Sequence, residues 1–433
     1  MNTITVRIED GRPFTCAAGT RISDLPHPTN PTPGLPFIGA LVNNDVTSLT
    51  APLSVNSDIR LLTMADPHGW RVYRNSLCFL LAKTIRETFP KAVFAIEHSF
   101  GPGLYCTFRR SANARDGISR RQLAALDAHM RALGRRDIPI EVRRLSFTDA
   151  VRQFEAAGQK DKLNILKYRN PPSVVIHWCG GFSDVAHGSL APSTGVLTRF
   201  HLVPYKPGFV LNLPERETPA RLPPFKDQPH LFNIFREHKE WGRILGVSTV
   251  GRLNEIIAAG EIENFILTAE ALHEKKLTRL ADQIAKARNR IKLILIAGPS
   301  SAGKTTFAKR LTVHLTVNGL RPLTIGTDDY FVEPDRTPRD DDGNLDYEHI
   351  EAVDLLRFNR DLLRLVQGKE VEPPRFDFET KKVRPGGRAL RLEDDQMLII
   401  EGIHGLNPRL THRVPSGRKF KIYVSALTQL NLD

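Results

Sequence analysis

The chain has 433 residues, too many for one ordinary hydrophobic core, so roughly two to four domains are expected. Hydrophobic residues make up 41% of the chain and charged residues 25%. This balance is typical of a soluble globular protein and excludes a disordered or membrane-embedded one. The net charge of +13 favours polyanionic partners such as nucleotides or RNA.

No apolar run approaches the roughly 20 residues that span a bilayer, so no membrane contact is expected. The first residues lack the basic start and the apolar stretch of a signal peptide. The cysteines are Cys16, Cys78, Cys106 and Cys179, and none of them forms a C-x-x-C pair. Structural thiols in the reduced cytoplasm are therefore predicted.

Short segments of alternating polarity open the chain. Thr3–Ile8 and the segment after the next turn predict a β-hairpin. A short helix capped near Thr20 is expected next, followed by strands over Phe37–Asn44 and Asp58–Thr63. This order over residues 1–65 is a β-grasp pattern and resembles the TGS domain at the N-terminus of threonyl-tRNA synthetases. The resemblance implies a docking or ligand-sensing module without catalytic residues.

The next region predicts an α+β domain. Apolar residues at helical spacing occupy Arg74–Pro90, and Glu97–Phe108 is Gly-rich between two strand-like pieces. Phe182–Pro204 precedes a strand-rich tail. Together, residues 66–225 resemble the second additional domain of threonyl- and alanyl-tRNA synthetases, which carries their editing site.

That editing site uses an H-x-x-x-H motif on the helix and a later C-x-x-x-H motif, a set with metal-ligand spacing. In this chain the matching positions hold Asn75 and Phe79, then Ala186 and Leu190. The resemblance therefore implies that the editing chemistry has been lost and that a ligand-binding cleft or a scaffold is left. The other candidate ligands are interpreted as ordinary structural or loop residues: His98, His177, Cys179 and His187.

Arginines are concentrated in Arg109–Arg152, for which RNA contact and a solvated basic helix face both stay open. The Pro-rich Pro214–Pro229 predicts a connector rather than a core element. Residues 226–290 predict a helical connector with a break at Gly260. Its last helix carries an apolar stripe that predicts packing along its length: Ile266, Leu267, Leu272, Leu277, Leu280 and Ile284.

The strongest motif is G-x-x-x-x-G-K-T within LILIAGPSSAGKTTF, Leu293–Phe307. The context predicts a buried parallel strand, a loop, and a helix from Thr305 to about Leu315. Such a loop wraps backbone N–H groups around phosphates, and the helix N-terminus adds a favourable dipole. Because the strand and helix are both present, a chance Gly-rich turn is the less favoured alternative. The predicted nucleotide-binding residues are Gly298, Pro299, Ser300, Ser301, Ala302, Gly303, Lys304, Thr305 and Thr306.

Lys304 is expected to reach the β- and γ-phosphates of ATP, and the Thr305 hydroxyl to hold Mg²⁺. A second strand within Arg321–Phe331 ends at two aspartates, and Asp328 can take a proton from a substrate hydroxyl. A third buried strand ends at Glu401, which is expected to help hold Mg²⁺.

Five ordered segments resemble the uridine kinase and phosphoribulokinase family: the P-loop, a D-x-F-Y-like segment, Asn344–Asp354, Pro373–Pro385, and the E-G-I strand end. The resemblance implies an ATP-dependent nucleoside kinase that phosphorylates a ribose 5′-hydroxyl, with Asp328 as general base. Lys381 stands where uridine-cytidine kinases place a base-contacting His, so pyrimidine preference stays open. The implied acceptor-binding residues are Tyr330, Phe331, Tyr347, Glu348, His349, Phe376, Asp377, Phe378 and Lys381.

The predicted fold is therefore multidomain α+β and α/β, ending in a P-loop domain with a parallel sheet over residues 291–433. Family kinases continue into an Arg-rich lid helix and a further strand, whereas this chain ends at Asp433. The expectation is an incomplete kinase domain that binds ATP and phosphorylates poorly, with the alternative that the family's remaining part is supplied elsewhere.

Two other functions stay open. The chain could be an ATP-switched regulatory protein that binds RNA through its basic N-terminal half. It could also be a phosphosugar kinase, which the basic residues Arg375, Lys381, Lys382 and Arg384 favour. Assembly into a homo-oligomer is likewise left open.

Overall fold

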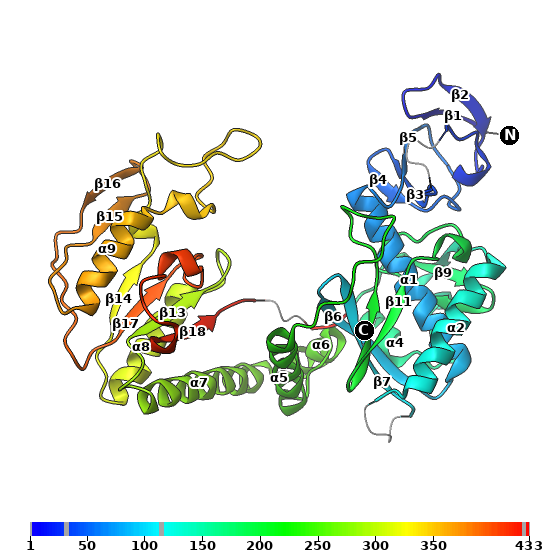
Figure 1. The fold of residues 1–433 in the computed structure, drawn as a ribbon. Coiled ribbons are helices and arrows are strands. Elements are labelled where there is room, and N and C mark those ends of the chain that lie inside the picture. The colour runs from blue at the N-terminus through cyan, green and yellow to red at the C-terminus, as the bar shows by residue number, and fades with distance from the viewer. Residues whose placement is uncertain (1, 30–33, 112–116, 427–429, 433) are drawn as a thin grey trace. The chain divides into compact units, whose positions relative to one another are not determined.

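The computed structural model describes residues 2–29, 34–111, 117–426 and 430–432. The chain folds into two compact units. The first is Met1–Lys239 with Ser248–Asn254 and Asn431–Asp433, and the second is Glu240–Val247 with Glu255–Leu430. Each unit has its own hydrophobic clusters. Figure 1 labels the helices and strands of both units.

The first unit opens with a five-stranded sheet of order β2-β1-β5-β3-β4. Only β1 and β5 pair in parallel, and the other neighbours are antiparallel. Alternate residues of β1 are buried, as expected of a sheet with one covered face. The strands are β1 (Thr3–Ile8), β2 (Phe14–Ala17), β3 (Gly39–Val42), β4 (Asp45–Thr47) and β5 (Ser57–Leu62). The predicted short helix is a 3-10 turn, Ile22–Asp24, and its N-cap is Arg21, next to Thr20.

The rest of this unit is an α+β arrangement with two sheets, of order β11-β12-β7-β6 and β10-β9-β8. The helices α1 and α2 share one large apolar cluster with the first of these sheets. The helices are α1 (Pro67–Thr88), α2 (Arg120–Arg136), α3 (Phe147–Ala156) and α4 (Lys160–Leu166). The strands are β6 (Val93–Phe100), β7 (Gly103–Arg109), β8 (Glu141–Ser146), β9 (Ser173–Cys179), β10 (Phe182–Asp184), β11 (His201–Tyr205) and β12 (Gly208–Asn212).

Three helices follow: α5 (Pro229–Leu245), α6 (Val250–Ala258) and α7 (Ile262–Lys286). Gly260, with a φ of 75°, separates α6 from α7 as predicted. The predicted packing stripe of α7 is wrong in its first half, because Ile266 and Leu267 are 47% and 64% exposed. Only the second half of α7 is buried, where it packs on α8 (Lys304–Val317).

The second unit is built on a four-stranded parallel sheet of order β14-β17-β13-β18. Its strands are β13 (Leu293–Ala297), β14 (Leu323–Gly326), β17 (Leu398–Glu401) and β18 (Lys419–Tyr423). Ile294 and Ile296 join α7 and α8 in one apolar cluster, whereas Leu293 and Leu295 join α9 (Leu355–Val366) in another. Both faces of the sheet are therefore covered, which explains why all five residues of β13 are buried.

A two-stranded antiparallel ribbon, β15 (Pro374–Asp377) and β16 (Lys382–Pro385), completes the second unit. Short 3-10 turns occupy Asp328–Tyr330, Ile350–Ala352, Pro408–Leu410 and Ser416–Arg418. The prediction of a multidomain chain with α+β parts and a parallel-sheet α/β part is confirmed.

Candidate active site at the carboxyl edge of the parallel sheet

Three neighbouring strands of the parallel sheet bring the predicted site residues to one edge. The loop from Gly298 follows β13, Asp328 follows β14, and Glu401 is the last residue of β17. Glu401 pairs in register with Ile296 on one side and Gly326 on the other. Ligands of open α/β sheets bind at the carboxyl ends of the strands, so this edge is the candidate site.

The loop after β13 has the backbone that phosphate binding requires. Ser301 and Gly303 have φ values of 59° and 83°, in the left-handed region. A Cβ on Gly298 would lie 1.9 Å from the Val424 carbonyl oxygen, so no larger residue fits there. The helix α8 begins at Lys304 without a side-chain cap, which leaves its first N–H groups available to an anion. The Lys304 Nζ donates to the Pro299 carbonyl, 2.9 Å away.

The two predicted metal-holding side chains lie together, because the Thr305 hydroxyl donates to Glu401 Oε1 over 3.0 Å. Burial raises the pKa of Glu401, and the charges of Asp328 and Asp329 add to this, against the Thr305 hydrogen bond and Lys304. Burial also raises the pKa of Asp329. Carboxylates held this way are stabilised by a cation, and Mg²⁺ needs only one or two of them beside phosphate oxygens and water. These residues therefore fit Mg²⁺.

Asp328 is held by a residue that lies just inside the sheet edge. The hydroxyl of Thr327, which is fully buried, donates to Asp328 Oδ1 over 3.2 Å. A Cβ on Gly402 would lie 1.7 Å from that Thr327 oxygen. The absence of a side chain at Gly402 thus lets β14 and β17 bring Asp328 and Glu401 to the same edge.

The predicted acceptor segment reaches the phosphate loop, since the Ser300 hydroxyl lies 3.4 Å from Glu348 Oε1. Next to it, four predicted acceptor residues form an aromatic cluster whose ring centroids lie 5.2 to 6.1 Å apart. The cluster is Phe331, Tyr347, Phe376 and Phe378. Phe378 is 62% exposed, and the buried Tyr347 Oη makes no hydrogen bond with any described residue. The cluster therefore offers an exposed ring and an unused polar atom to a ligand.

The structure does not bring every predicted acceptor residue into this cluster. Tyr330 is 2% exposed and packs on Phe358, with its hydroxyl 3.4 Å from Asp361, and burial raises its pKa. His349 accepts a hydrogen bond from the Glu351 N–H and so caps a 3-10 turn. Asp377 accepts from two N–H groups of the β15–β16 turn, and Lys381 is exposed in that turn with a φ of 53°.

His404 is a residue of this edge that the sequence interpretation missed. Burial lowers its pKa, whereas hydrogen bonds with the backbone of His349 and Glu348 and the charge of Asp328 oppose that shift. Its Nε2 is buried and has no partner among the described residues. The signal was present in the sequence, because His404 follows Glu401 by two intervening residues in the segment EGIH.

In the first unit, the positions matching the editing motifs do come together. The Asn75 side chain donates to the His187 carbonyl over 3.5 Å, and Leu190 is fully buried. Phe79 makes edge contacts with His177 and Phe182. Across residues 2–29, 34–111, 117–426 and 430–432, no group of three His, Cys, Asp or Glu could hold a metal ion. Apolar packing thus occupies much of this region.

The arginines of the basic stretch lie mainly on α2 and β8, with Arg109 at the end of β7 and Arg152 on α3. Several of them have partners: Arg131 pairs with Asp127, and Arg143 pairs with Glu141 and lies over the Trp178 ring. RNA contact stays a prediction. No helix in the described part of the chain is both long and apolar enough to cross a membrane.

The loop, the carboxylates and the parallel sheet give the second unit the architecture of a P-loop nucleotide-binding domain. Residues 293–433 match the family model described as the Phosphoribulokinase / Uridine kinase family. The match to this family thus covers the C-terminal part of the chain.

The N-terminal half is similar to threonine–tRNA ligases. The ligase of Francisella tularensis subsp. novicida (strain U112) is 26% identical over 199 residues, which cover 46% of this chain and 31% of the ligase. The ligase of Francisella tularensis subsp. tularensis (strain WY96-3418) is 25% identical over 199 residues. The chain thus spans less than a third of the length of these relatives.

A solved structure of a possible uridine kinase from Bacillus stearothermophilus is also similar. It is 24% identical, covers 34% of this chain and 80% of that one, and has a TM-score of 0.28. A score this low carries no argument about the fold, which rests on the strand order and the family match.

Proposed function

We propose that the chain is an ATP-dependent phosphotransferase that phosphorylates the ribose 5′-hydroxyl of a nucleoside. The observation that carries this proposal is the meeting of three parts in one unit. These are the phosphate loop, the acids at the carboxyl ends of β14 and β17, and the aromatic cluster whose segment contacts Ser300.

In this proposal, the loop N–H groups and Lys304 hold the triphosphate, and Thr305 and Glu401 hold Mg²⁺. When bound, Mg²⁺ neutralises the charge that develops on the phosphate oxygens. Asp328 accepts the proton of the acceptor hydroxyl as that hydroxyl attacks the γ-phosphate. The Thr327 hydroxyl fixes the orientation of Asp328, because it donates to one of its two carboxylate oxygens.

A nucleoside fits the aromatic cluster better than a plain sugar does, because a base can stack on an exposed ring. Phe378 offers such a ring, and Tyr347 Oη offers a hydrogen bond to the base or ribose. The second candidate is a phosphosugar. Arg375 favours a phosphosugar acceptor. Burial raises the pKa of the nearby Asp329, the positive charge of Arg375 opposes this shift, and the same charge would attract a phosphate on the acceptor.

The test is ATP-dependent phosphorylation by the 433-residue chain across a panel of nucleosides, 5′-deoxynucleosides and phosphosugars. We expect product with a nucleoside and none with its 5′-deoxy analogue. Asp328→Asn should lower kcat by a factor of about 100 or more and leave ATP binding unchanged. The matched control is Asp341→Asn, which changes an exposed acid outside the proposed site. Product with phosphosugars alone would replace the acceptor, and unchanged turnover in Asp328→Asn would remove the proposed base.

We further propose that residues 1–65 form a TGS-like domain and that residues 66–225 form a synthetase-derived scaffold without editing activity. The similarity to threonine–tRNA ligases supports this division. The side chains at Asn75, Phe79, Ala186 and Leu190 support the loss of editing, because none of them is a typical zinc ligand. The corresponding test is hydrolysis of mischarged tRNA, for which we expect a rate equal to that without protein.

A further inference from the structure

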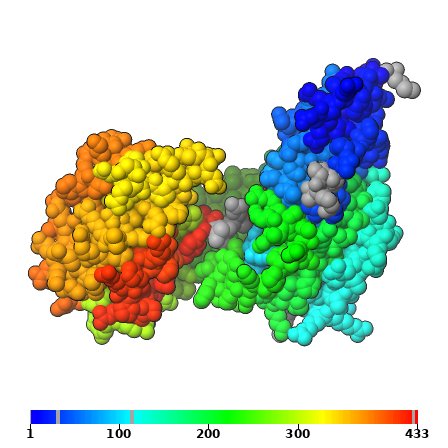
Figure 2. Space-filling view, turned by 45° about the horizontal axis from the view of Figure 1, so that its top comes forward, coloured from blue at the N-terminus to red at the C-terminus, as the bar shows by residue number. Residues whose placement is uncertain are grey.

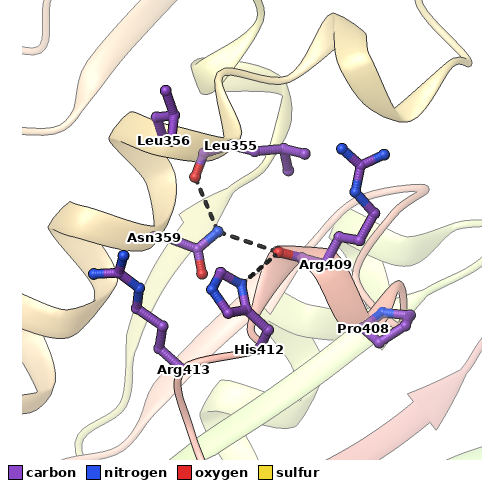
Figure 3. Close-up of a pocket in the computed structure, with 7 residues that line it drawn as sticks. All are labelled: Leu355, Leu356, Asn359, Pro408, Arg409, His412 and Arg413. Atoms are coloured by element: carbon purple, nitrogen blue, oxygen red, sulfur yellow. Dashed lines mark hydrogen bonds between the residues drawn. The ribbon is translucent and has the colours of Figure 1, made fainter.

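A pocket of the second unit lies between α9 and the segment that follows β17. In the space-filling view, the orange residues around α9 and the red residues after β17 form one continuous surface (Figure 2). The pocket has an open volume of about 450 Å³, within the range of small-molecule sites. It is lined by Leu355, Leu356, Asn359, Pro408, Arg409, His412 and Arg413 (Figure 3).

One part of this lining is apolar and exposed. Leu356 is 86% exposed although it stands at the second position of an amphipathic helix, next to Leu355. Pro408, in the 3-10 turn Pro408–Leu410, adds a second apolar side chain to the lining. An apolar surface that meets water at a concave site favours the binding of a ligand with an apolar portion.

The other part of the lining is basic. Arg409 and Arg413 stand on either side of Asn359 and His412 (Figure 3). Arg413 makes no hydrogen bond or ion pair with any described residue, and Arg409 forms an exposed ion pair of 2.6 Å with Glu351. Guanidinium groups bind carboxylates and phosphates through paired hydrogen bonds, so this part favours an anion.

Asn359 lines the pocket between Arg409 and Arg413, and hydrogen bonds fix its side chain. It is 5% exposed, and its side-chain N–H group donates to the carbonyls of Leu355 and Arg409, at 2.9 and 3.2 Å. Its Oδ1 is buried and has no partner among the described residues. Asn359 thus ties the backbone of Arg409 to the first turn of α9.

We propose that this pocket is a second ligand site for a small organic anion, a phosphate or a carboxylate attached to an apolar group. Its guanidinium groups take the anion, and Leu355, Leu356 and Pro408 take the apolar group. The site is separate from the phosphate loop and from the aromatic cluster, because it shares no residue with either.

The pocket is connected to the proposed acceptor segment by Arg409. The side chain of Arg409 is paired with Glu351, which lies in the 3-10 turn Ile350–Ala352. His349 caps this turn and follows Tyr347 and Glu348 in the chain. An exposed ion pair is weak, so a bound anion can take Arg409 away from Glu351. Occupancy should then loosen the acceptor segment and raise the KM for the acceptor by up to about fivefold, without changing the KM for ATP. This consequence, unlike the binding itself, rests on the proposed function.

Binding is tested by calorimetry on the full chain, with the phosphate loop filled by a non-hydrolysable ATP analogue and Mg²⁺. The probes are phenyl phosphate, benzoate and inorganic phosphate. We expect saturable binding of phenyl phosphate or benzoate, and the probe that binds identifies the anion. Arg413→Ala should weaken that binding at least tenfold. Leu356→Asp, which adds a negative charge at an exposed position, should do the same, whereas Arg388→Ala, on another loop, should bind as the unaltered chain does.

Three results would overturn the proposal. The first is that neither organic probe saturates at millimolar concentration. The second is that inorganic phosphate binds as well as phenyl phosphate, which indicates an adventitious ion only. The third is that Arg413→Ala and Leu356→Asp bind unchanged. If an organic probe binds but no acceptor is phosphorylated, the proposed function is wrong and the second ligand site stands. If an acceptor is phosphorylated but no probe binds, the proposed function stands and the second ligand site is wrong.

Discussion

At the scale of single residues, the clearest constraint in the proposed site is the missing side chain of Gly402. Its φ is 154°, and an added Cβ would lie 1.7 Å from the Thr327 hydroxyl that holds Asp328. We predict that Gly402→Ala lowers the free energy of unfolding of the second unit by about 2 kcal/mol, because β14 and β17 must separate. Chemical denaturation measures this loss, and turnover should fall with it.

The chain offers a matched control for this substitution. A Cβ on Gly417 would meet nothing within 4 Å, so Gly417→Ala should change the free energy of unfolding by less than about 0.5 kcal/mol. Equal stability of the two variants would contradict the close approach of Gly402 and Thr327.

A buried histidine predicts a pH dependence of the first unit. Burial lowers the pKa of His177 from its ordinary 6.5 to about 4. The unfolded chain takes up a proton in that window and the folded chain does not, so stability falls as the pH drops from 6.5 toward 4. From about pH 7 to about pH 5, the loss from His177 is about 2 kcal/mol.

Replacing this histidine should remove that part of the dependence. His177→Leu should therefore lose less stability between the two pH values, as measured by urea denaturation. His201→Leu, at an exposed position of β11, should keep the full dependence. The lowered pKa of His98 contributes to the remaining slope in both variants. Identical slopes in both variants would contradict the burial of an uncharged His177.

At the scale of elements, the sequence predicts best where one signal decides the structure. The run Leu293–Ala297 forms a strand as predicted, and the glycine-rich loop and a helix follow it. Gly260, which has a φ of 75°, ends a helix as predicted, and Gly319, with a φ of 78°, follows the end of α8. The sequence could not show that Tyr330 packs on Phe358 while Phe331 joins the aromatic cluster, because these partners are set by tertiary packing.

Helix α7 shows the same limit on a larger scale. Its apolar spacing is continuous, but spacing alone does not say where the covering elements end. In the structure α8 covers Leu277, Ala281 and Ile284, whereas Ile266 and Leu267 are 47% and 64% exposed. Which residues of an amphipathic helix are buried thus depends on the length of its neighbour.

This difference gives a paired prediction for α7. Leu277→Ala removes a fully buried side chain and should lower the free energy of unfolding by about 3 kcal/mol. Leu267→Ala makes the same chemical change at a 64% exposed position and should cost less than about 0.5 kcal/mol. Thermal denaturation of the second unit distinguishes them, and similar losses would show that the first half of α7 is covered in solution.

At the scale of the whole molecule, the two compact units have separate cores. The α1–α2 cluster lies in the first unit, and the clusters on the two faces of the parallel sheet lie in the second. Family and relatives follow the same division, because the kinase family model matches residues 293–433 and the tRNA ligases match the N-terminal half. Separate cores predict separate unfolding, since a ligand stabilises only the core that holds its site.

Calorimetry of the full chain should therefore show two transitions. A non-hydrolysable ATP analogue with Mg²⁺, at about 100 times its Kd, should stabilise one of them by about 2.7 kcal/mol and leave the other unchanged. Gly402→Ala should lower the midpoint temperature of the transition that responds to nucleotide. Lowering the pH toward 5 should lower the midpoint temperature of the other transition, because His177 belongs to the first unit. Lys304→Ala should abolish the response to nucleotide, because the loop then lacks its cation. If both transitions rise together with nucleotide, the two units unfold as one cooperative body and their cores are coupled.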